Sequence, residues 1–301
     1  MKTMQQMHMK RRNRWLEEYI GRTFAVICGW LIILITVTMI IFLAVKGIQS
    51  FTDSGLSLSD MLLSAQWDPD GTPPKYGALI FIVGSMLVSL GALLISAPIA
   101  LALAIFMNFI APKWFVSLLK PVLELLVGIP SVVYGWLGVT ILVPLLREWF
   151  GGSGFSLLAG IIVLSLMILP TITSIAADAL ANVPMAYMEA SYGLGSTRWQ
   201  AISRVIVPAA KAGIATGVVL GLARAFGEAL AVQMVIGNTM KLPSGLDSPT
   251  ATLTSILTMD MANTINGTPW NNALWTLALI LLLISFFFIA VIRLVGPRKE
   301  R

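Results

Sequence analysis

Two ionisable residues lie four positions apart within a long apolar stretch of the sequence. Arg224 and Glu228 belong to the run 209–237, and another acid, Glu124, belongs to the run 115–146. A charge at the centre of a membrane costs about 2.5–3.5 kcal/mol, whereas an ion pair four residues apart on a helix returns only about 0.2–0.5 kcal/mol. Because pairing does not offset burial, we expect Arg224, Glu228 and Glu124 to line a path for a substrate. Mutual neutralisation of Arg224 and Glu228 in a packed interior is the alternative.

The helix expected to carry this pair has a small residue at every fourth position. Gly213, Gly217 and Gly221 fall at about 0°, 40° and 80° around a helix, with Arg224 at about 20° and Glu228 at about 60°. Small residues let helices approach closely. The sequence therefore predicts that this face meets protein or a polar cavity rather than lipid.

Glu124 precedes an expected helix break at Gly128 and Pro130. Proline cannot donate a backbone hydrogen bond, and irregular backbone at membrane depth is tolerated where it lines a cavity or is buried in protein. A cavity wall and a plain kink are equally good interpretations of these residues alone.

The composition excludes several classes of protein. The chain is 57% hydrophobic and 11% charged, against roughly 25% charged residues in an ordinary soluble domain. Cys28 and His8 are the only residues of their types, which excludes Cys/His metal sites, disulfides within the chain and His-based catalytic triads. The net charge of +6 is spread over short segments between apolar runs, so nucleic acid is not an expected partner.

The apolar runs predict an all-α, polytopic membrane protein with six transmembrane helices. One membrane domain, 24–295, is expected between a cytoplasmic segment, 1–23, and a cytoplasmic tail, 296–301. The expected spans are 24–45, 77–107, 115–146, 155–177, 209–237 and 272–295. With both termini in the cytoplasm, only four of the 20 Lys and Arg residues fall outside, and Arg224 falls within a span. The four outside are Lys46, Lys75, Arg147 and Lys241.

The cytoplasmic loop 182–208 is expected to form two short helices. Pro184 favours the start of the first helix, and Gly195 its end. Thr197 and Gln200 have the spacing of a capping box, which predicts that the second helix begins at once. The outer loop from Asn238 to Trp270 is long, and a short helix is expected within 250–261.

The same cytoplasmic loop resembles the EAA loop of ATP-binding-cassette import permeases. The matching residues are Glu189-Ala190-Ser191, Gly195 and Val205-Ile206-Val207-Pro208, with Ser191, Val205 and Val207 departing conservatively from the pattern. The resemblance implies a coupling helix that docks into an ATPase subunit. It gives Glu189, Ala190 and Gly195 the role of ATPase coupling.

Three further segments resemble the C-type permease subunits of the phosphate-specific Pst importers: Gly128-Ile129-Pro130-Ser131-Val132-Val133-Tyr134-Gly135, Gly221-Leu222-Ala223-Arg224-Ala225-Phe226-Gly227-Glu228 and Met234-Val235-Ile236-Gly237-Asn238. This resemblance implies the type I importer permease fold in a bacterial inner (plasma) membrane. It also implies a homologous A-type permease partner, an ATPase dimer that holds ATP-Mg, and an extracytoplasmic phosphate-binding protein. In that family the corresponding Arg and Glu are implicated in phosphate movement, which points to Arg224 and Glu228.

Other functions remain open on the residues alone. The coupling loop does not encode the substrate, so molybdate or sulfate is the alternative oxyanion. A secondary transporter is a further alternative. The sequence contains no Walker A motif, so ATP is expected on a partner and no cofactor is expected in this chain. An enzyme is not expected, because the spans offer no nucleophile paired with a histidine base.

Overall fold

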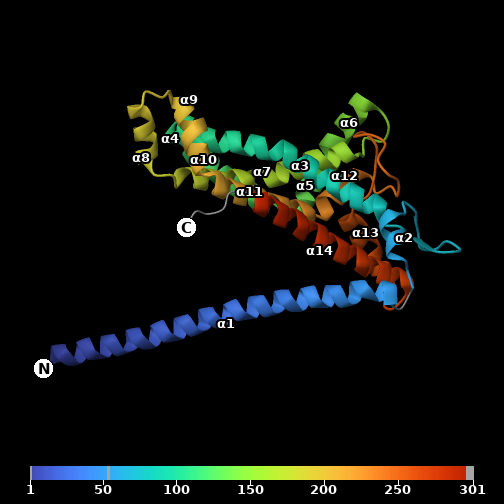
Figure 1. The fold of residues 1–301 in the computed structure, drawn as a ribbon, viewed down its shortest axis with the longest axis horizontal. Coiled ribbons are helices and arrows are strands. Elements are labelled where there is room, and N and C mark those ends of the chain that lie inside the picture. Colours follow the sequence, from blue (N-terminus) through green and yellow to red (C-terminus); the bar gives the residue numbers. More distant parts are fainter. Residues whose placement is uncertain (1, 53–54, 296–301) are drawn as a thin grey trace.

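The computed structural model describes residues 2–52 and 55–295, with side chains from Tyr19 to Leu294. This part of the chain is predominantly helical (Figure 1), as predicted. The helices are α1 (Lys2–Thr52), α2 (Leu58–Leu63), α3 (Leu79–Ile105), α4 (Lys113–Gly128), α5 (Ser131–Leu137), α6 (Val143–Phe150), α7 (Leu157–Ala181), α8 (Met185–Gly193), α9 (Arg198–Ala201), α10 (Val207–Ala209), α11 (Lys211–Gly227), α12 (Leu230–Ile236), α13 (Leu253–Asp260) and α14 (Pro269–Val295).

Shorter elements join these helices. Three π-helical turns, η1 (Phe106–Ile110), η2 (Gly138–Leu142) and η3 (Ile202–Ile206), and one 3-10 turn, η4 (Met261–Asn263), continue or connect them. Two short strands, β1 (Trp67–Asp68) and β2 (Lys75–Tyr76), pair antiparallel, with Trp67 opposite Tyr76.

Five helical stretches in the described chain are long and apolar enough to cross a membrane, and a bent pair of helices raises the number to six. The five are Tyr19–Thr52, Leu79–Ile110, Ser131–Phe150, Leu157–Ala181 and Pro269–Leu294. The bent pair is Arg198–Ala209 with Lys211–Gly227, at an angle of 67°. The predicted six-span fold thus agrees with the structure when this pair is one span.

The predicted span 209–237 is not one helix, which corrects the expectation from its apolar run. Helix α11 ends at Gly227, Glu228 is extended with φ −77° and ψ 123°, and α12 begins at Leu230. The Glu228 side chain accepts a hydrogen bond from the Ala231 N–H at 3.0 Å. A polar residue that satisfies the first amides of a new helix favours a restart over continuation.

The stretch 113–150 is interrupted where the sequence places Gly128 and Pro130. Helix α4 ends at Gly128, and α5 begins at Ser131. Pro130 has no N–H for the carbonyl four residues earlier, that of Leu126. The Tyr134 hydroxyl donates to this carbonyl at 2.9 Å, so the break leaves it satisfied.

Helix α7 is the centre of the bundle. In its most apolar window 61% of the residues are buried, whereas none is buried in the corresponding window of α1. Buried side chains of α7, such as Leu164 and Ile168, form a core with α3 and α12. Helix α1 lies apart from this bundle and contacts it near its C-terminal end, where the Thr276 hydroxyl of α14 donates to the Gly47 carbonyl (Figure 1).

The loop after α12 folds back into the bundle. The predicted outer helix is present as α13, but its first residues are buried rather than on the surface. The Leu253 N–H donates to the Ser85 hydroxyl of α3 at 2.8 Å, and a Cβ on Gly84 would collide with the Ala251 carbonyl oxygen. Burial raises the pKa of Asp260 at the end of α13. The start of α13 is therefore packed closely against α3.

The ends of the predicted domain can be followed in part. Helix α1 runs through the expected segment 1–23 from Lys2 onward, and the expected tail 296–301 lies outside the described residues. The last turns of α14 and the first turns of α1 point toward the end of the molecule that carries α8 and α9 (Figure 1).

Candidate functional site

The glycine face of α11 packs against α7. A Cβ on Gly213 would meet Ala179, and one on Gly221 would meet Ile172. At Gly217 the added atom would lie 3.3 Å from the Ile172 carbonyl oxygen and from Ile175. The prediction that this face meets protein is confirmed, and the absence of side chains is what permits the close approach.

Arg224 continues this face by one turn and is bound to α7. Its Nη1 donates to the Thr171 hydroxyl at 3.0 Å, and the side chain is half-buried. A guanidinium carries five N–H donors. Within the described chain its other donors have no protein partner, so they are available to a ligand.

Glu228 serves a different element from Arg224. The expectation that both residues share one face of one helix is wrong, because Glu228 lies beyond the end of α11. Its Oε1 binds the Ala231 N–H, and in the described part of the chain Oε2 has no protein partner. Neutralisation of Arg224 by Glu228 is likewise not observed, since each side chain is bound elsewhere.

Glu124 lies in a groove between α4 and α7. The groove has a volume of 330 Å³, and we call it the α4–α7 groove. Its lining is Met107, Lys120, Leu123, Glu124, Val127, Ser174, Ala177 and Asp178. Four of these side chains are polar or charged, and all four are exposed: Lys120, Glu124, Ser174 and Asp178.

Arg224 and Glu124 both lie beside hydroxyl-bearing residues of α7. Arg224 binds Thr171, and Glu124 shares a groove with Ser174, one turn later on the same helix. Thr171 is half-buried and Ser174 is exposed, so two hydroxyl groups one turn apart on α7 lie beside Arg224 and in the α4–α7 groove, respectively. The sequence analysis missed Thr171 and Ser174, although hydroxyl groups within an otherwise apolar span are the signal that identifies them.

The loop 182–208 forms a projection at one end of the molecule (Figure 1). Helices α8 and α9 meet there, and large apolar side chains are exposed, including Leu194 at 90% and Trp199 at 62%. Glu189 and Ala190 are exposed on α8. Apolar side chains on a protruding segment are typical of an interaction surface.

The turn between α8 and α9 depends on local hydrogen bonds and on a glycine. Gly195 has φ +82°, a conformation that favours glycine. The predicted capping box is present, with Thr197 accepting the Gln200 N–H and Gln200 accepting the Thr197 N–H. Ser191, which replaces an alanine of the EAA pattern, lies 2.6 Å from Ser196 through their hydroxyl oxygens. These contacts fix the angle between the two helices.

The described residues hold no group of three or more His, Cys, Asp and Glu side chains positioned to bind a metal. A bundle with five or six apolar spans, hydroxyl-bearing residues on its central helix and an apolar projection defines a membrane permease with a docking segment. Residues 98–301 match the family described as binding-protein-dependent transport system inner membrane component. The chain belongs to this family of ABC transporter permeases.

Relatives are similar over most of the chain. The probable ABC transporter permease protein YqgH of Bacillus subtilis (strain 168) is 53% identical over 96% of this chain and 94% of that protein. The phosphate transport system permease protein PstC of Pasteurella multocida (strain Pm70) is 37% identical over 81% of this chain and 83% of that protein.

Solved structures show the same fold at lower identity. A chain from a bacterial ABC transporter involved in the import of the acidic polysaccharide alginate aligns with a TM-score of 0.59 and 17% identity, over 90% of this chain and 96% of that chain. A chain from the inward-facing MetNI methionine ABC transporter aligns with a TM-score of 0.53 and 21% identity, over 73% of this chain and 95% of that chain. The importer permease fold predicted from the sequence is confirmed.

Proposed function

We propose that this chain is one permease subunit of an ATP-driven importer of inorganic phosphate, and that Arg224 and Glu228 bind phosphate during its passage. The observation that carries the proposal is the hydrogen bonding of the two side chains. Each is anchored by one hydrogen bond, Arg224 to Thr171 and Glu228 to the Ala231 N–H. Each retains polar atoms without a protein partner in the described chain.

The chemistry of these free atoms suits phosphate. The planar fork of a guanidinium can donate two parallel hydrogen bonds to phosphate oxygens. A carboxylate accepts a hydrogen bond from a protonated phosphate but not from fully ionised sulfate. Arg224 therefore supplies attraction, and Glu228 supplies discrimination between the two oxyanions. The similarity to the phosphate transport system permease protein PstC named above supports this choice of substrate.

The remaining parts of the importer follow from the family. We assign ATP hydrolysis to a separate ATPase dimer, which docks on the projection formed by α8 and α9 through Glu189, Ala190 and the turn at Gly195. A homologous A-type permease is the proposed second half of the membrane channel. An extracytoplasmic phosphate-binding protein delivers the substrate.

The test is uptake of labelled phosphate by the complete importer in proteoliposomes. Arg224→Gln removes the charge and the fork, and we expect uptake to fall by at least about tenfold, the effect of losing one charged hydrogen bond. Arg224→Lys keeps the charge but not the fork, so intermediate uptake is expected. Excess sulfate should not compete with phosphate.

Copurification of the ATPase with each variant serves as the control for assembly. Normal uptake by assembled Arg224→Gln importer would refute the role of Arg224. Competition by sulfate at a concentration equal to that of phosphate would refute the discrimination between the two oxyanions assigned to Glu228.

A further inference from the structure

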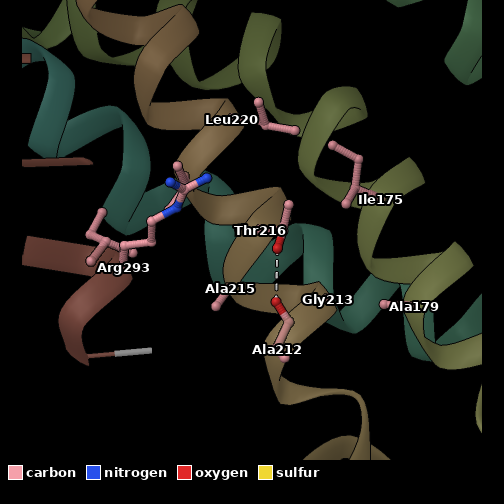
Figure 2. A pocket seen from close by; sticks show the side chains of 10 residues that line it. Ile175, Ala179, Ala212, Gly213, Ala215, Thr216, Leu220 and Arg293 are labelled. Atoms are coloured by element: carbon pink, nitrogen blue, oxygen red, sulfur yellow. Dashed lines mark hydrogen bonds between the residues drawn. The ribbon is translucent and has the colours of Figure 1, made fainter. Parts of the chain in front are cut away.

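A second groove lies between α7, α11 and α14, with a volume of 630 Å³ (Figure 2). We call it the inner groove. Ala179 near the end of α7 and Ala212 at the start of α11 place it toward the end of the molecule that carries α8 and α9. Most of its wall is apolar or small, and the hydroxyl of Thr216 on α11 donates to the Ala212 carbonyl at 2.9 Å.

The inner groove begins one helical turn from the proposed phosphate contact. Leu220 and Ile175 line it, and each is four residues from a member of that contact, Arg224 and Thr171. Four residues span about 6 Å along a helix axis. The inner groove therefore begins about one helical turn from the Arg224–Thr171 contact, beside the packed joint of α7 and α11.

Arg293 supplies the positive charge of the inner groove. Figure 2 shows its side chain extending from α14 toward α11. Lys211 is at the start of α11 but lines a neighbouring groove of 490 Å³, whose other lining residues are all apolar. The two cations thus lie near the same end of the bundle but line different grooves, and the groove of Arg293 is the larger of the two.

We propose that the inner groove is a second oxyanion site, in which Arg293 receives phosphate after Arg224 releases it. The inference rests on the proposed function. A dianion in a groove with apolar walls gains strongly from a fixed positive charge, because field lines concentrate between low-dielectric walls. The guanidinium of Arg293 also offers the paired donors that phosphate oxygens accept. Arg293 then binds the phosphate after it leaves Arg224 and before it leaves the permease.

The test is the maximal rate of labelled phosphate uptake by the complete importer in neutral phosphatidylcholine vesicles. Arg293→Gln should lower this rate by about tenfold, the effect expected from losing one charged hydrogen bond. The phosphate concentration for half-maximal uptake should stay unchanged, because it reflects capture outside the membrane. Arg293→Lys should restore much of the rate.

Lys211→Gln is the matched control, since it removes a cation near the same end of the bundle from the other groove. It should transport like the wild type. Equal rates for Arg293→Gln and Lys211→Gln would overturn the inference. So would a defect of Arg293→Gln that appears only in vesicles containing anionic phospholipid, because the groove would then hold an anionic lipid headgroup rather than free phosphate.

The two proposals fail in different ways. A wild-type importer that does not transport phosphate refutes the proposed function itself. A wild-type importer that transports phosphate, is disabled by Arg224→Gln and is unaffected by Arg293→Gln refutes only the second site.

Discussion

At the residue scale, Glu228 combines a structural role with the proposed role in transport. Its Oε1 accepts a hydrogen bond from the Ala231 N–H at the start of α12. Its charge lies just beyond the end of α11, the helix that carries Arg224. Amide and carboxylate side chains can both accept the capping hydrogen bond, whereas only the carboxylate is charged. The two roles can therefore be separated by the choice of substitution.

We predict that Glu228→Gln keeps the importer assembled but lowers phosphate uptake. Glu228→Leu should also lose the cap, which costs about 0.5–2 kcal/mol of stability. Thermal unfolding of the purified importer should therefore differ between the two variants, with Glu228→Leu unfolding at the lower temperature. Identical unfolding temperatures would contradict the capping role, and normal uptake by Glu228→Gln would contradict the transport role.

At the element scale, the relation between α8 and α9 depends on the backbone of Gly195. Its φ of +82° lies in the left-handed region, where a Cβ costs about 1–2 kcal/mol. Gly193 provides a contrast two residues earlier, because it ends the α8 helix and a Cβ there would meet no atom within 4 Å.

Gly195→Ala should consequently reduce copurification of the ATPase with the permease, since the strained turn changes the angle of the docking surface. Gly193→Ala should leave copurification unchanged, because helical backbone accepts alanine readily. Similar losses for both variants would mean that the loop is merely sensitive to substitution, and would contradict a specific requirement for the left-handed turn.

Much of the helical architecture could be predicted from the sequence, because long apolar runs have few structural solutions in a membrane. The capping box at Thr197 and the packing of the α11 glycines also followed from local patterns. The break at Glu228 could not be predicted in this way. Its apolar neighbours favour one continuous helix, and only the hydrogen bond to Ala231 favours the restart.

Contacts between segments that are distant in the sequence could not be predicted from local patterns, for a different reason. The bond from Arg224 to Thr171 joins residues 53 positions apart. The groove that holds Glu124 exists only because α4 packs on α7. Periodicity assigns a side chain to a face of its own helix, but not to a partner on another helix.

At the scale of the whole molecule, the exposed surface has two kinds of region. Helix α1 and much of α14 expose large apolar side chains, both aliphatic and aromatic, which suits lipid. The side formed by α4, α7 and α11 also carries polar and charged side chains, Lys120, Ser174, Asp178 and Arg224, beside exposed apolar residues of α4. We infer that this polar side faces the proposed second permease and forms one wall of a conduit between them.

The most direct test of this conduit is the reaction of single cysteines with a charged, membrane-impermeant thiol reagent. The background is Cys28→Ser, which removes the only native cysteine. Ser174→Cys places a thiol in the α4–α7 groove, and Leu94→Cys places one on α3 at a position 76% exposed in the isolated subunit. In the complete importer we predict rapid labelling of Ser174→Cys, slowed by saturating phosphate, and little labelling of Leu94→Cys. Equal labelling of the two positions, or none at Ser174→Cys, would contradict a water-filled conduit along α7.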